Sequence, residues 1–338
     1  MPAEVTSLSE SASASDFGNY LYRALMSSGG DLAVMRSLNV LRPDDWIMFD
    51  KKVVEISRAG FTMVSDFIGN GMRYEIPDAL GVMSIQWDRI GEMGAAQWGM
   101  MPDTVIQRHR LEFNTDYMPV PLIHHGFNLN IRHLMASQRQ GLPLDTAHVA
   151  ESTRLVVDGI ENMFVNGSFT AGAGSGTMYG VLAYPYRITG SLTASWITAT
   201  PDQIFADANA IIAALEAKNQ YGPYGMYVPP TYAQALRKDY TRVLTGGQGV
   251  GGNKTVLQRL MDIEGLKYIK THRFIPADTV AVIQLTPETV DVLDGIQPKL
   301  IEWQTSGGMQ TNYQVIAIML PRPKRDALDQ NGIAHFHV

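Results

Sequence analysis

The alternation of apolar and polar positions predicts one long helix and one shorter helix in the first half of the chain. The long helix begins near Asp145 and ends at the Asn166-Gly167 pair, a sequence typical of helix termination. Its apolar face repeats every three or four residues, at Val149, Thr153, Val156, Ile160 and Met163 or Phe164. The shorter helix follows Pro43, with Trp46, Phe49, Val53 and Ile56 at the same spacing.

Strand-like patterns dominate the end of the chain. The stretches TVAVIQLTP, KLIEWQT and YQVIAIMLPRP each predict a strand, and PLIHHGFNLNI predicts another before the long helix. An Ala-rich helix, PDQIFADANAIIAALEAKN, precedes the strand YGMYVPP. Because helices and strands do not alternate regularly, the pattern predicts an α+β fold.

Two segments lack the apolar surface for a core of their own. Residues 1–42 are rich in Ser, Ala and Gly, which predicts an extended arm that orders only against another surface. Residues 69–111 contain glycines and prolines between short alternating stretches, which predicts a long hairpin lying on a neighbour. The hairpin is rich in methionine, an adaptable residue at contact surfaces, at Met72, Met83, Met93, Met100 and Met101. The candidate subunit-interface residues are Phe17, Tyr20, Leu21, Leu25, Trp87, Trp98, Met100 and Met101.

The glycine-rich stretch TGGQGVGGNKT, residues 245–255, superficially resembles a phosphate-binding loop. Such a loop needs a lysine directly after its last glycine, whereas Asn253 separates Gly252 from Lys254. The preceding segment also spaces Tyr232, Leu236 and Tyr240 like a helix face rather than a buried strand. We therefore interpret the stretch as a surface loop and not as a nucleotide site.

The composition argues against a membrane-spanning protein, a disulfide-linked protein and a protein that binds nucleic acid tightly. The chain has 338 residues, 45% of them hydrophobic, and no apolar run long enough to span a membrane. It contains no cysteine, which excludes disulfides and fits a reducing cytoplasm. A formal net charge of −6 without any basic run argues against a protein that grips nucleic acid through its phosphates.

Histidine and carboxylate residues form no constellation whose spacing is typical of a catalytic or metal site. His124 and His125 are adjacent in a predicted strand, so their side chains point to opposite faces. His335 and His337 share a face, but two ligands without a supporting carboxylate make a weak metal site. The notable acids are interpreted as helix-capping or solvated residues; they are Asp44, Asp45, Glu151 and Glu161. No catalytic, cofactor-binding or metal-binding residue is assigned, and the chain is expected not to be an enzyme.

Three stretches resemble the shell-protein superfamily shared by tailed-phage major capsid proteins of the Hong Kong phage type and encapsulin nanocompartments. They are RPDDWIMFDKKVVEISRAG, the stretch from PLIHHGFNLNIRHLM to VVDGIENMFVNG, and GPYGMYVPPTYAQALRKDY. The resemblance rests on the order and spacing of elements, and it covers most of residues 43–240.

The resemblance implies a capsid fold with an N-terminal arm, an extension loop, a peripheral domain with a long spine helix, and an apical domain. Its implied boundaries are the N-terminal arm at 1–42, peripheral segments at 43–68, 112–185 and 296–338, the extension loop at 69–111 and the apical domain at 186–295. The last peripheral segment comprises return strands and a C-terminal tail. The glycine-rich stretch would then lie near the capsomer axis, with Gly246, Gly247, Gly249, Gly251 and Gly252 as candidates.

The function that the resemblance implies is self-assembly, through pentamers and hexamers, into an icosahedral shell around phage double-stranded DNA. Scaffolding, portal and decoration proteins are further expected partners, DNA is enclosed without sequence-specific binding, no membrane is involved, and the virion is assembled in host cytoplasm. The alternative is an encapsulin-type shell around cargo enzymes. About forty residues before Pro43 and the tail ALDQNGIAHFHV favour the phage capsid. Lysine is absent between Lys52 and Lys218, so a lysine cross-link in the extension loop is unavailable.

Overall fold

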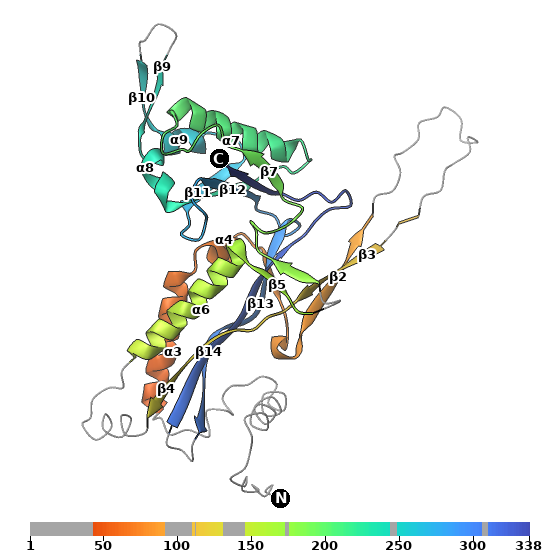
Figure 1. The fold of residues 1–338 in the computed structure, drawn as a ribbon, viewed down its shortest axis with the longest axis vertical. Helices are drawn as coiled ribbons and strands as arrows, with labels where there is room; N and C mark the ends of the chain where they lie inside the picture. The colour runs from red at the N-terminus through yellow and green to blue at the C-terminus, as the bar shows by residue number, and fades with distance from the viewer. Residues whose placement is uncertain are drawn as a thin grey trace, which may run out of the picture.

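The computed structural model describes residues 43–91, 110–111, 113–130, 146–172, 176–243, 249–305 and 310–338. These residues form two connected units, each with its own sheet, and a two-stranded arm that projects from them (Figure 1). The core under the long helix continues onto one face of the second sheet, and another core fills its opposite face. We call the units the long-helix unit and the five-stranded unit. None of the helices in this part of the chain is long and apolar enough to cross a membrane.

The long-helix unit packs its helices on a four-stranded sheet with the strand order β1-β13-β14-β4. The helices are α3 (Pro43–Gly60), α4 (Met63–Gly69) and α6 (Ala147–Asn166). The strands are β1 (Arg73–Glu75), β4 (Ile123–Asn130), β13 (Val290–Thr305) and β14 (Gln310–Pro323). Smaller elements are the 3-10 helix η1 (Ala79–Gly81) and the paired strands β5 (Ser168–Thr170) and β6 (Thr177–Tyr179).

Helix α6 has the buried face that its periodicity predicts. Its buried residues include every predicted position except Met163, which is partly buried. The helix ends at Asn166, and a Cβ on Gly167 would collide with the Met163 carbonyl oxygen. Glycine is therefore required where the chain leaves the helix. Phe49 and Val53 of α3 are also buried in this core, which confirms the shorter predicted helix.

The five-stranded unit is a mixed sheet with the order β11-β8-β12-β15-β7. Its strands are β7 (Ile188–Ser191), β8 (Tyr224–Val228), β11 (Leu266–Thr271), β12 (Thr279–Gln284) and β15 (Ile333–His337). Its helices are α7 (Pro201–Glu216), the 3-10 helix η2 (Pro230–Tyr232), α8 (Ala233–Leu236) and α9 (Val256–Met261). A capping box starts α7, where the Thr200 hydroxyl accepts from the Gln203 amide.

The last strand of the chain lies in a different unit from the one that the sequence predicts. Residues 296–338 were expected to stay with the long helix, but β15 pairs with β12 and, in parallel, with β7. The chain therefore returns to the five-stranded unit, and its C-terminus lies there (Figure 1). Within the expected tail, Ile333–His337 is an interior strand of that sheet.

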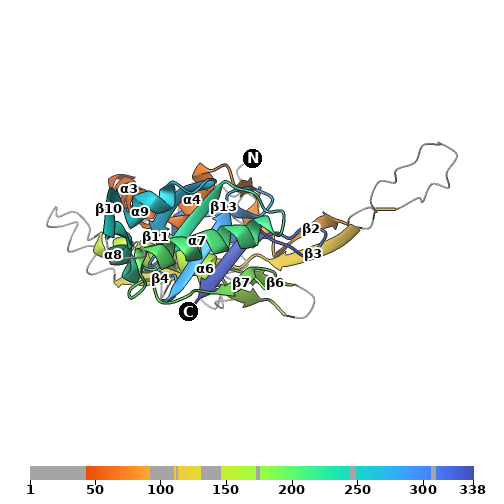
Figure 2. The same ribbon diagram turned by 90° about the horizontal axis from the view of Figure 1, so that it is seen from above.

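The projecting arm is an antiparallel ribbon of β2 (Ser84–Ile90) and β3 (Phe113–Pro119). It extends away from both units in two perpendicular views (Figures 1 and 2). The sequence placed the hairpin at 69–111, but the return strand runs to Pro119 and the chain before Ser84 belongs to the body. Met72 is completely buried in the core, so its interpretation as a partner-facing methionine was wrong, whereas Met83 is exposed.

The glycine-rich stretch is part of a second ribbon rather than a loop alone. Strands β9 (Asp239–Val243) and β10 (Gly249–Thr255) pair antiparallel and project from the five-stranded unit (Figure 1). The predicted helix face through Tyr240 was wrong, because α8 ends at Leu236 and Tyr240 lies in β9.

Candidate assembly surfaces

The two faces of the β2–β3 ribbon have different environments. On one face, Trp87 is half-buried against its own chain, with the Arg322 guanidinium 5.4 Å from its ring centroid. On the opposite face, Phe113 is 62% and Tyr117 49% exposed. The interface role predicted for Trp87 remains a prediction. The better exposed apolar side chains of this ribbon come from β3.

A cluster of ion pairs fixes the base of the ribbon to residues after β14. Arg325 donates to the Asp116 carboxylate from Nη2 (2.7 Å) and from Nη1 to Asp329 (3.0 Å). Arg89 also pairs with Asp329. The guanidinium of Arg325 lies 4.2 Å from the Tyr186 ring centroid, and its hydrogen bond with Asp116 raises the pKa of Arg325. We call this cluster the arginine clasp; it sets the direction in which the ribbon leaves the body.

Most of the other predicted contact residues lie outside the described residues. These are Phe17, Tyr20, Leu21, Leu25, Trp98, Met100, Met101, Gly246 and Gly247. Their assignments to subunit contacts and to the capsomer axis stay predictions.

The remaining glycines of the candidate capsomer-axis stretch, Gly249, Gly251 and Gly252, lie in β10. Gly249 pairs with Val243 across the ribbon. Lys254 Nζ lies 2.6 Å from Asp262 Oδ2, so this lysine is engaged by a carboxylate. A phosphate loop needs its lysine directed at the ligand, and the ribbon geometry gives no such arrangement in the part of the stretch that the structure describes.

Glu161 corrects the interpretation of the helix acids as solvated. It is 1% exposed, and its carboxylate accepts hydrogen bonds from the amide of Thr62 (2.7 Å) and those of Met63 and Val64 (both 3.3 Å). It also accepts from His272 Nε2 (2.8 Å), because the Phe274 amide donates to Nδ1 and leaves the proton on Nε2. Glu161 thus caps α4 and joins both units.

The signal for this role was present in the helical pattern. Glu161 follows Val157 by four residues and precedes Phe164 by three, which places it on the buried face of α6. Glu151, in contrast, is exposed and pairs with Arg154, as predicted for a solvated acid. Asp44 and Asp45 lie in the first turn of α3.

The histidines singled out in the sequence lie in separate environments. His124 is exposed and His125 half-buried, with Nδ1 of His125 3.1 Å from the Ser152 hydroxyl, which confirms their opposite faces. His335 accepts from Arg187 Nε at 3.0 Å, and its burial lowers its pKa to about 4. Within the described ranges, no group of three metal-ligating side chains comes together.

The fold is that of the Hong Kong phage-type capsid and encapsulin shell proteins, as the sequence resemblance predicted. A virus-like particle from Pyrococcus furiosus matches with a TM-score of 0.57 and 18% identity, over 86% of this chain and 98% of that one. The capsid of Myoviridae phage XM1 matches with a TM-score of 0.60 and 14% identity, over 82% and 92%. A structure of Mycobacterium phage Adephagia gives 0.58 and 7%, over 80% and 89%.

Residues 36–315 match the model of a family of unknown function, DUF6260, and the chain belongs to that family. A comparison of the sequence with curated proteins finds no match.

Proposed function

We propose that this chain is a major capsid protein that assembles into a closed icosahedral shell enclosing phage double-stranded DNA. The observation that carries the proposal is the fold, which covers most of this chain and most of each shell protein that it matches. The projecting β2–β3 ribbon supports it, because exposed aromatic side chains on an arm outside the cores suit a contact between copies.

In self-association through pentamers and hexamers, the two ribbons and residues 1–42 would each make contacts between copies. The arginine clasp would hold the ribbon in the direction needed to reach a neighbouring copy. The β9–β10 ribbon would approach its symmetry copies around the capsomer axis, and residues 1–42 would add contacts at a distance. Scaffolding, portal and decoration proteins are further proposed partners.

The shell would enclose the DNA without binding it tightly. A net charge of −6 leaves little electrostatic attraction for phosphates over the chain as a whole, so binding would be weak and independent of sequence. The role is structural and not enzymatic. The chain would be a component of the virion after assembly in the host cytoplasm.

A cargo-enclosing nanocompartment of the encapsulin type is the second candidate. It is favoured by one observation: the virus-like particle from Pyrococcus furiosus has the highest identity, 18%, among the three structures compared, and it matches over 98% of its own length.

Particles purified from the native source distinguish the two candidates. Nuclease-protected double-stranded DNA inside closed shells is expected of the capsid. Shells that lack DNA and retain a co-purifying enzyme would instead support the nanocompartment. A small oligomer that never closes would contradict both.

A further inference from the structure

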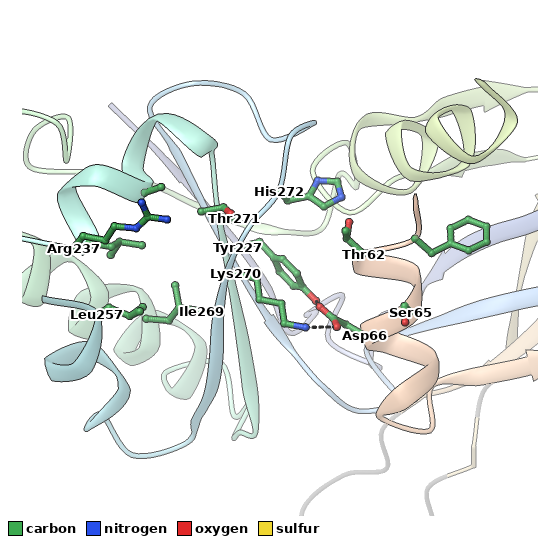
Figure 3. A pocket seen from close by; sticks show the side chains of 13 residues that line it. Thr62, Ser65, Asp66, Tyr227, Arg237, Leu257, Ile269, Lys270, Thr271 and His272 are labelled. Atoms are coloured by element: carbon green, nitrogen blue, oxygen red, sulfur yellow. Dashed lines mark hydrogen bonds and ion pairs between the residues drawn. The ribbon is translucent and has the colours of Figure 1, made fainter. Parts of the chain in front are cut away.

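A groove of about 530 Å³ lies between the two units, directly over strand β11. Figure 3 shows its two walls: α4 contributes Ser65 and Asp66, and the opposite side contributes Arg237 and Leu257 from the region of α8 and α9. The buried Glu161–His272 pair lies at one end, where His272 lines the groove. The groove is therefore built on elements that the core holds in place.

The floor of the groove is an unpaired strand edge. Strand β11 is the last strand of its sheet, and no described strand pairs with its outer side. Because the His272 amide donates to the Val228 carbonyl, the alternate residues Ile269 and Thr271 direct their backbone groups away from β8. Both residues line the groove. A peptide in extended conformation could pair with these groups, as peptides do at other open sheet edges.

The groove has one apolar wall, one wall of mixed character and a cationic rim. Leu236 and Leu257 line the apolar wall, and Phe61 lies on the other wall beside polar residues of α4. On the rim, Lys270 is paired with Asp66 at 2.5 Å, whereas the exposed guanidinium of Arg237 has no ion pair within the described ranges. The unbalanced charge is positive, so the groove favours an extended segment that carries acidic residues.

We propose that this groove docks residues 1–16 of the chain, MPAEVTSLSESASASD, as an added strand on β11. This segment contains Glu4, Glu10 and Asp16 and no lysine or arginine, so its charge complements the rim. Val5 and Leu8 are an odd number of residues apart and therefore lie on opposite faces of an extended strand. One of them can contact the apolar wall, and the other can contact Phe61 on the mixed wall. A second copy of β11 is a poorer occupant, because lysines on both edges would repel each other.

The chain is long enough for this docking. Helix α3 ends at Gly60, next to Phe61 in the groove, and its 18 residues place Pro43 about 27 Å away. Residues 17–42 can span up to about 85 Å when extended. The segment can therefore reach the groove of its own subunit or that of a neighbour, and the proposal holds whether or not copies close into a shell.

Disulfide trapping in the full-length protein tests the docking without background, because the native chain has no cysteine. Leu8→Cys would be combined with either Ser65→Cys on one wall or Ala233→Cys on the other, and Val5→Cys likewise. After mild oxidation, we expect Leu8→Cys to cross-link to one wall and Val5→Cys to the opposite wall. Non-reducing gels separate cross-links within a subunit from those between subunits, and either supports the docking.

The matched control is Ser191→Cys, an equally conservative change on β7, the opposite edge strand of the same sheet. Arg237→Glu should reduce trapping about fivefold or more, the effect of losing one partly exposed charge pair. Lys218→Glu, an exposed reversal outside the groove, should leave it unchanged. Trapping at Ser191 equal to that in the groove, or no trapping at either wall, would overturn the proposal.

Discussion

Replacing Glu161 with alanine should destabilise the junction of the two units more than any surface change on α6. The substitution removes the acceptor for three backbone amides at the start of α4 and for His272 Nε2. Loss of a helix cap costs about 1 kcal/mol, and a buried donor left without its partner adds about 1–3 kcal/mol. Together these give a loss of about 2–4 kcal/mol.

Glu161→Gln retains one acceptor oxygen and the side-chain shape, but its amide NH2 faces another donor. We expect about half the loss of the alanine variant, or about 1–2 kcal/mol. Glu151→Ala is the matched control, since this exposed acid of the same helix pairs only with a neighbouring arginine, and it should cause no measurable change.

Urea unfolding of the unassembled subunit, followed by circular dichroism, measures these differences. Hydrogen exchange locates them, because amides at the start of α4 should lose protection before those of α6. A loss below about 1 kcal/mol for Glu161→Ala would show that Glu161 does not hold the junction, since water would then replace its carboxylate without cost.

Other expected outcomes concern the ribbons, the arm and one buried acid. Trp87→Ala should cost about 2 kcal/mol, because a half-buried ring loses about half of a full core truncation, and should impair closed shells in electron micrographs; wild-type shells of unchanged stability would contradict this. Lys254→Ala should leave assembly unchanged, since Lys254 pairs with Asp262 at the surface, and the wild-type protein should show no ATP binding in calorimetry; ATP binding by the wild type that the variant loses would overturn this. Burial raises the pKa of Glu302 to about 7, so native Glu302 keeps its proton where the unfolded chain has lost it, and stability falls as pH rises from about 4.5 to 7. Glu302→Gln should therefore raise the melting temperature relative to wild type at pH 8 and give a smaller gain at pH 5; equal differences at both values would disprove the assignment. Deleting residues 2–38 should leave α6 folded but give weak or mis-sized shells, and shells of normal size and thermal stability would show that the arm is dispensable.

The elements that the sequence predicted best are those stabilised by local periodicity. Helix α6 was found within two residues at its start because its apolar positions recur over five turns and an Asn-Gly pair ends it. The strands β12 and β14 were also predicted, because a short continuous apolar run bounded by turn residues is typical of a buried strand.

The errors share a dependence on contacts between distant parts of the chain. Met72 is buried because β1 pairs with β13, and three residues of strand are too few to show a pattern. Strand β15 lies between β12 and β7 through pairings that no local signal encodes. Glu161 was interpreted from its charge rather than its helical position, although a buried carboxylate is stable when several donors surround it.

The groove between the two units and the arginine clasp could not be predicted from the sequence. Arg325 and Asp116 are far apart along the chain, and only the fold brings them to 2.7 Å. The residues of the groove come from α4, α8, α9 and β11, whose order gives no hint that their side chains converge. Candidate contact residues were instead chosen from segments that lacked a core of their own.

Cryo-electron microscopy of the purified full-length protein tests most directly whether copies of this chain close into a shell. We expect closed icosahedral particles in which the β2–β3 ribbon of each copy lies on a neighbouring subunit, with the exposed Phe113 and Tyr117 covered by that neighbour. A protein that remains monomeric under assembly conditions, or closed particles in which both side chains stay exposed to solvent, would contradict it.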